Sequence, residues 1–242
     1  MKHLQRLLAA LTLALTFSVP LTATPITVQN HSFETATLPI PVADANMNNL
    51  FTLTGTTAHW TAVGPNNNTA YGGSFQQFIT GMFPNWTDPN PWWSGQNVGY
   101  LFPFGNTGPI ALQQVLSDTL ADDTTYDLGV LVGRRTFDWG GPGFFYDVQL
   151  LAGGNLLASG NALALAVDSW GQHSLSYNSG SNNPFSGQAL SIRLVANQNE
   201  VYFDDVTLNA TSNVPEPSSM AVMALGLGVV AYRLRLRGRR RA

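Results

Sequence analysis

Apolar side chains recur at every second residue in several parts of this chain, and this period most constrains its fold. The period runs through residues 126–132, 144–150 and 190–194, residues 201–208 form the last strand-like run, and residues 24–29 are rich in β-branched residues. Successive strand residues point to opposite faces, so such runs, separated by Gly, Asn and Pro clusters, are typical of antiparallel strands. No segment between the two termini keeps helical spacing for long. The sequence therefore predicts an all-β fold, an antiparallel β-sandwich.

The last 29 residues, 214–242, combine three features in a fixed order. Pro215, Glu216 and Pro217 form a stiff segment, because each proline fixes its own φ. Residues 220–232 are apolar or small apart from one tyrosine, and six arginines end the chain. A bilayer core needs about 20 apolar residues, a length that the flanking residues can supply. We expect a C-terminal transmembrane helix with its arginines in the cytoplasm. The alternative is a terminal helix of a soluble domain with a basic end.

This order of Pro-Glu-Pro, apolar helix and arginine cluster resembles the PEP-CTERM sorting signal of Gram-negative bacteria. The resemblance implies a protein of the Gram-negative cell envelope, found at the cell surface or secreted. It also implies a transient anchor in the inner membrane and a cut near Pro-Glu-Pro by a partner, an exosortase-like enzyme.

The N-terminus carries a second targeting pattern. Lys2, His3 and Arg6 precede an apolar run over residues 7–17, and small residues follow. This pattern is typical of a secretory signal peptide. We therefore expect a signal peptide over 1–23, one β-sandwich domain over 24–213, and the sorting signal over 214–242.

The charge of the expected domain limits its partners. Residues 24–213 hold three arginines, no lysine and thirteen acidic residues, a net charge of −10, whereas the whole chain carries only −3. Such a surface cannot neutralise a run of phosphates, so nucleic acid is excluded as a partner. A neutral ligand or a divalent cation fits better. The chain has no cysteine, but about 190 residues bury enough apolar surface to fold without disulfides.

Two short motifs at opposite ends of the domain bear on its fold. Asn30-His-Ser-Phe-Glu34 stands near the start, and Val201-Tyr-Phe-Asp-Asp-Val-Thr-Leu208 stands at the end. Together they resemble the frame of galactose-binding-like jelly rolls, which are common among carbohydrate-binding modules. The resemblance implies a structural calcium ion shared by Glu34 and an aspartate of the last strand, Asp204 or Asp205.

Strand alternation allows only one of these two aspartates to point inward. Asp205 is the expected ligand if it shares the inner face with Phe203. Calcium prefers carboxylate and carbonyl oxygens, which this pair of segments can supply. The alternative is that Glu34 and Asp205 are solvated carboxylates at strand ends.

An irregular segment over residues 61–109 is rich in aromatic residues among Gly, Asn and Pro. Long irregular loops are uncommon unless they are functional. Aromatic rings stack on sugar rings, and amide, guanidinium or carboxylate groups bind hydroxyls. The predicted sugar-binding residues are Trp86, Trp92, Trp93, Asn97, Arg134, Asp138 and Trp139. Alternatively, the tryptophans fill a core beneath the loop, and an arginine pairs with Asp138 or Asp147.

Nothing in the sequence selects a catalytic group. The histidines lack metal-binding spacing, and no serine stands in a Gly-x-Ser-x-Gly elbow. We therefore expect a non-catalytic exported protein that binds carbohydrate or exopolysaccharide. A hydrolase or lyase acting on polysaccharide from a jelly-roll scaffold, and a purely structural surface protein, remain the alternatives.

Overall fold

The computed structural model describes residues 22–35, 58–64, 70–76, 97–103, 108–134, 146–161, 165–167, 169–197, 200–214, 226–230 and 233. Of β3 only the backbone is described, and of β4 the side chains of Asn97 and Phe102 are not. The chain divides into two units, Thr24–Ala210 and a second unit made of Met1–Ala23 with Thr211–Ala242.

The described part of the second unit includes a helical stretch over residues 226–230. Among the residues that the structure describes, none lies in a helix that is both long and apolar enough to cross a bilayer. Residues 1–21 of the expected signal peptide, and most of the expected transmembrane helix, lie outside these residues.

The first unit is a β-sandwich of eleven described strands. They are β1 (Thr24–Ile26), β2 (Thr61–Val63), β3 (Ala70–Gln76), β4 (Asn97–Pro103), β5 (Ile110–Thr119), β6 (Thr124–Arg134), β7 (Tyr146–Ala152), β8 (Asn155–Gly160), β9 (Ser169–Asn178), β10 (Ala189–Ala196) and β11 (Val201–Ser212). The predicted strand over 24–29 is shorter than expected, because only its first three residues pair with a neighbour.

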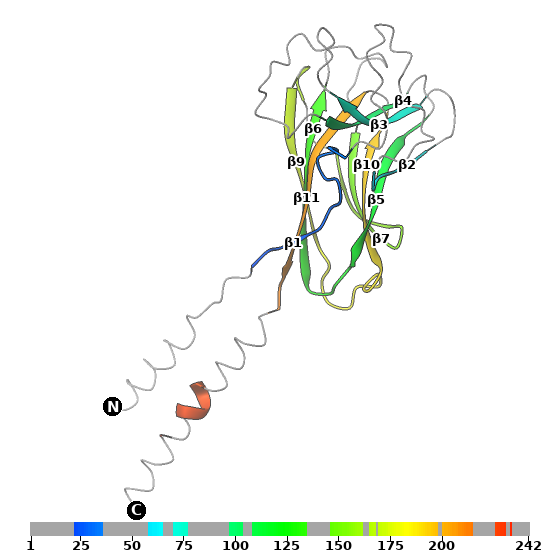
Figure 1. Ribbon diagram of the computed structural model, residues 1–242. Helices are drawn as coiled ribbons and strands as arrows, with labels where there is room; N and C mark the ends of the chain where they lie inside the picture. Colours follow the sequence, from blue (N-terminus) through cyan, green and yellow to red (C-terminus); the bar gives the residue numbers. More distant parts are fainter. Residues whose placement is uncertain are drawn as a thin grey trace, which may run out of the picture. The chain divides into compact units, whose positions relative to one another are not determined.

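The strands form two sheets that face each other (Figure 1). One sheet has the order β3-β4-β11-β6-β9, with β1 added along β11, and the other has the order β2-β5-β10-β7-β8. The pairing is antiparallel in β10 with β5 and β7, in β6 with β9 and in β3 with β4. The predicted all-β antiparallel sandwich is confirmed.

The core lies between the two sheets, and the period-two pattern explains its composition. On β6, residues 126, 128, 130 and 132 are buried in it, and on β10 residues 190, 192 and 194 are. Its largest fully buried members are Trp60, Tyr126, Tyr146, Phe33, Phe203, Leu101, Ile110, Leu112, Leu120, Leu128 and Leu150.

The alternation fails at one point of β11. Phe203 and Val206 both lie in the core, although three positions separate them. The extra residue is accommodated at Asp205, whose φ of 44° lies in the left-handed region. Asp204 is fully buried and Asp205 is half-buried. The expectation that Asp205 shares the inner face with Phe203 is therefore wrong, because Val206 takes that place.

Hydrogen bonds hold the segment after β1 against β11 and against β5. The backbone N–H of Val206 donates to the carbonyl of His31 over 3.0 Å. Buried Gln114 exchanges two 2.8 Å hydrogen bonds with the backbone of Gln29, as a neighbouring strand would. These hydrogen bonds tie the first and last strands together. Glu34 comes three residues after His31 in the tied segment.

Candidate functional site

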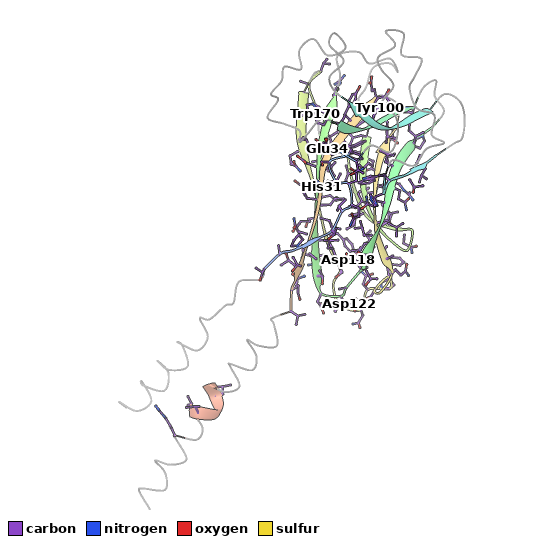
Figure 2. The ribbon with its side chains drawn as sticks, in the orientation of Figure 1. His31, Glu34, Tyr100, Asp118, Asp122 and Trp170 are labelled. Atoms are coloured by element: carbon purple, nitrogen blue, oxygen red, sulfur yellow. The ribbon has the colours of Figure 1, made fainter. Side chains whose placement is uncertain are left out.

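A group of buried aromatic and acidic side chains lies on the outer face of the six-stranded sheet, the face turned away from the five-stranded sheet. The members of this outer-face cluster are Tyr100, Trp170, Glu200, Tyr202 and Asp204. Their exposed fractions are all between 0% and 7%. None of them belongs to the core between the sheets. Figure 2 places Tyr100 and Trp170 at one end of the sandwich, and Asp118 and Asp122 at the other.

Strand register places the three aromatic rings in a row. Tyr202 of β11 lies directly opposite Tyr100 of β4, and their ring centroids are 5.3 Å apart. On the other side, the ring of Trp170 lies 6.3 Å from that of Tyr202. Tyr202 is therefore held between two other rings. Such tilted ring pairs are each worth about 0.5–1.5 kcal/mol beyond the area they bury.

A glycine of β6 allows this row to form. Gly133 pairs with Trp170 across the two strands, and β6 lies between β9 and β11. A Cβ atom at Gly133 would lie 2.7 Å from the indole ring, closer than van der Waals contact allows. The indole therefore lies directly over the backbone of Gly133 and reaches Tyr202.

Two carboxyl groups accompany the rings. The hydroxyl of Tyr202 donates a hydrogen bond to Oε1 of Glu200. Oδ1 of Asp204 accepts a 2.8 Å hydrogen bond from the backbone N–H of Asp205. Burying an ionisable group is costly unless hydrogen bonds compensate for lost water. Both carboxyl groups have such hydrogen bonds, and a buried carboxyl group beside aromatic rings can also take part in proton transfer or ligand recognition.

Most of the predicted sugar-binding residues lie outside the described part of the chain. These are Trp86, Trp92, Trp93, Asp138 and Trp139. Asn97 begins β4, but its side chain is not described. Arg134 ends β6, and its Nη1 donates a 3.0 Å hydrogen bond to the carbonyl of Leu165.

The three predicted calcium ligands differ in their surroundings. Glu34 is exposed, Asp205 is half-buried and Asp204 is fully buried. Within the described ranges, no group of three or more His, Cys, Asp or Glu side chains is placed to hold a metal ion. The donor chemistry suits calcium, which also accepts backbone carbonyls. Calcium therefore stays a prediction.

Sequence reasoning missed four members of the cluster, namely Tyr100, Trp170, Glu200 and Tyr202. One signal for them was present. In Val201-Tyr-Phe-Asp the alternation puts Tyr202 and Asp204 together on the face opposite the core.

A second buried polar pair lies inside the core. The hydroxyl of Tyr146 and Nδ1 of His173 are 3.0 Å apart. His173 is 4% exposed, and its Nε2 has no hydrogen-bond partner among the described residues. Burial lowers the pKa of His173, and the nearby Asp147 carboxylate partly opposes this effect. This pair is separate from the outer-face cluster.

Two family models match this chain, one over the sandwich and one over the C-terminal segment. The family described as HpiC1 cyclase, HpiC1-like, matches residues 24–209, the whole sandwich. The chain belongs to the HpiC1-like family. A second model, the PEP-CTERM protein-sorting motif, matches residues 213–241. The predicted sorting motif at Pro215, Glu216 and Pro217 is confirmed. This HpiC1-like protein is thus an exported protein of a Gram-negative-type envelope. No curated protein sequence matches it.

Solved structures share the fold of this HpiC1-like protein. A cyclase from Fischerella sp. TAU, in complex with 4-(1H-indol-3-yl)butan-2-one, is 24% identical, with a TM-score of 0.62, covering 80% of this chain and 100% of that one. An apo cyclase from Fischerella sp. is 23% identical, with a TM-score of 0.63, covering 80% and 98%. TmCBM61 in complex with β-1,4-galactotriose is 14% identical, with a TM-score of 0.43, covering 76% and 98%. Structural neighbours therefore include a carbohydrate-binding module.

Proposed function

We propose that the exported domain binds a small ring-bearing molecule at the outer-face cluster and converts it by proton transfer, as a cyclase. The observation that carries this proposal is the row of three buried rings with two carboxyl groups beside it. Membership of a family described as HpiC1 cyclase supports it. Aromatic side chains are suitable neighbours for a flat ring, and the carboxyl groups offer sites for a proton.

Closing a ring without oxidation moves a proton to one atom of the substrate and takes a proton from another. A positioned carboxyl group commonly does this work as a general acid or base. We assign this role to Asp204, which is fully buried and faces the same side of β11 as Tyr202. Glu200 has a different role, because it accepts the hydroxyl hydrogen of Tyr202 and so fixes that ring.

The test uses the fact that such a cyclisation leaves the mass of the substrate unchanged. The purified protein is incubated with a small-molecule extract of its native host, and liquid chromatography with mass spectrometry follows each compound. We expect a new peak of unchanged mass with the wild type and none with Asp204→Asn. Asp118→Asn is the matched control, since Asp118 lies at the opposite end of the sandwich (Figure 2). Loss of the peak in both variants, or in neither, would contradict the role of Asp204.

Binding is measured separately with two ketones that share one side chain. The first probe is 4-(1H-indol-3-yl)butan-2-one, which the cyclase from Fischerella sp. TAU binds. The second is 4-phenylbutan-2-one, whose ring is a single six-membered ring. Calorimetric titration of the wild type should detect binding of the first probe.

A second candidate function is non-catalytic binding of carbohydrate or exopolysaccharide, the function expected from the sequence. Rings beside carboxyl groups also suit a sugar, whose faces stack and whose hydroxyls donate hydrogen bonds. Export supports this candidate, because polysaccharide is available outside the cell. Retention on a glycan array, together with no isomer formed and no ketone bound, would favour this candidate over the cyclase.

The sorting motif supports a further part of the proposal. We infer that an exosortase-like enzyme cuts the chain near Pro215–Pro217 after the C-terminal helix has anchored it transiently in the inner membrane.

A further inference from the structure

His173 and Gly160 close one edge of the sandwich. His173 lies on β9 and Gly160 ends β8, and these are the end strands of the two described sheets. A Cβ atom at Gly160 would lie 2.7 Å from Nε2 of His173 and 3.0 Å from Cε1. The imidazole therefore lies directly against the backbone of Gly160. Its Nε2 atom is buried there and has no hydrogen-bond partner among the described residues.

The other ring nitrogen of His173 has a partner. Nδ1 lies 3.0 Å from the hydroxyl of Tyr146, and the two rings meet edge to face with their centroids 5.6 Å apart. A neutral imidazole carries one N–H group, whereas an imidazolium donates from both nitrogens. Protonated His173 would therefore hold an N–H group at Nε2, against Gly160, with no acceptor among the described residues. A buried charge without hydrogen bonds is strongly unfavourable, so the closed edge favours neutral His173.

The charged groups around His173 offset this cost only in part. β7 contributes Asp147, whose carboxylate attracts a protonated His173, and β8 carries no titratable side chain. On β6, the charged residues Asp127 and Arg134 lie three and four positions from the residue that pairs with His173. On β9 itself, Tyr177 lies four positions from His173. Burial outweighs the attraction of Asp147, so the pKa of His173 is lowered.

β8 is the element that can move most easily at this edge. None of its six residues is buried, and its pairing with β7 contains a register shift between Leu150 and Leu151. Its contribution to the core is the partly buried Leu157. Elements with few buried contacts open locally at a lower cost than the whole domain unfolds. Release of the end of β8 would expose Nε2 to water, where a histidine accepts a proton at its ordinary pKa of 6.5.

We propose that His173 is a pH-sensitive switch, whose protonation releases the end of β8 from β9 and opens this edge of the sandwich. Above pH 6.5 the neutral imidazole keeps the edge closed. As the pH falls below this value, the open form takes up a proton before the closed form does, so the fraction of open molecules rises. Such a switch suits an exported domain, which meets the pH of its surroundings. It does not depend on the proposed ligand site.

Hydrogen exchange of the purified protein, followed by mass spectrometry, tests this switch. Exchange rates corrected for the intrinsic rate at each pH give the opening constant of each strand. Between pH 7.5 and 5.5 the opening constant of β8 should rise about three- to tenfold, an increase that the uptake of one proton allows. β10, the central strand of the same sheet, should have a much smaller opening constant at both pH values. Low concentrations of urea should not speed exchange in β8, because a local opening exposes little surface.

Two substitutions change the two sides of the contact. His173→Gln keeps a polar group near Tyr146 but does not titrate, so the opening constant of β8 should be the same at both pH values. Gly160→Ala places a Cβ atom against Nε2, so β8 should already be open at pH 7.5. His31→Gln is the matched control, because His31 is exposed and its loss should leave the wild-type rise unchanged. His173→Gln keeps the proposal testable if Gly160→Ala fails to fold.

Three results would overturn the proposal. The first is a wild-type protein in which the opening constant of β8 does not change between pH 7.5 and 5.5. The second is a rise in His173→Gln as large as that in the wild type. The third is an equal opening constant in β8 and β10 at pH 5.5, because the domain would then open only as a whole.

Discussion

Single residues determine which face of a strand the following side chains occupy in this protein. Asp205 has a φ of 44°, a conformation that Asp and Asn tolerate better than most residues. Because Asp205 takes up the extra residue, Val206 enters the core and Asp204 stays with Tyr202 on the outer face. Asp-Asp in a sequence does not indicate such a conformation. Alternation alone therefore placed Asp205 on the inner face, a position that Val206 takes.

A glycine in the core gives the first prediction. A Cβ atom at Gly99 would lie 2.6 Å from the ring of Phe33, which is fully buried and stacks on Trp60. Gly99→Ala should destabilise the domain by about 1–3 kcal/mol, the usual cost of overpacking. At roughly 2–4 °C for each kcal/mol, the melting temperature should fall by several degrees. Adding Phe33→Leu to Gly99→Ala should recover part of the loss, and no recovery would argue against a clash with Phe33.

The buried histidine gives a prediction about pH. The pKa of His173 is lowered below its ordinary value of 6.5, chiefly by burial. The unfolded chain therefore takes up a proton first as the pH falls. Stability should be complete above pH 6.5 and should decline as the pH falls towards the folded-state pKa of His173. Urea unfolding at a series of pH values measures this decline.

The decline should be smaller in His173→Gln. His31→Gln is the control, because His31 is exposed and should leave the decline unchanged. An equal decline of stability in the wild type and in His173→Gln would show that other groups cause it.

At the scale of elements, the strands could be predicted from the sequence, whereas the site could not. Residues 190–194 alternate strictly, residues 126–132 alternate apart from Leu131, and their inward side chains form the core as expected. The outer-face cluster could not be predicted from the sequence, because it combines β4, β9 and β11, whose order in the sheet differs from their order in the chain. No local pattern reports that Tyr100 faces Tyr202, or that Gly133 makes room for Trp170.

The tie between the first and last strands gives the next prediction. If calcium joins Glu34 to Asp205 or Asp204, chelation should lower the melting temperature by several degrees, because a ligand held at a hundred times its Kd adds about 2.7 kcal/mol. Glu34→Gln should remove the response to added calcium. Asp122→Asn is the control, since Asp122 lies at the opposite end of the sandwich (Figure 2). Identical melting curves with calcium and with chelator would mean that this tie holds no metal ion.

At the scale of the whole molecule, the chain combines a domain of the HpiC1-like family with a PEP-CTERM sorting motif. The sequence indicated the sorting signal clearly, because the three parts of the motif are contiguous. It did not indicate the cyclase family, whose match extends over residues 24–209 as a whole. The domain is strongly acidic, so its ligand must be recognised without a basic surface.

The sorting motif predicts the C-terminus of the mature protein. Protein isolated from the native host should end near residues 214–218 and lack its arginine cluster. Intact-mass spectrometry measures this directly. Replacing Pro215 and Pro217 with alanine should leave the uncut form, and a wild-type protein that mostly retains Ala242 would contradict the processing.

The location of a bound ligand is the strongest test of the proposed outer-face site. Crystals of the mature protein soaked with 4-(1H-indol-3-yl)butan-2-one would show where the ring lies. We predict density for the ring on the outer face of the six-stranded sheet, in contact with Tyr202 and Trp170 and beside Asp204. Density between the sheets, at Trp92 and Trp93, or on the five-stranded sheet would contradict the account.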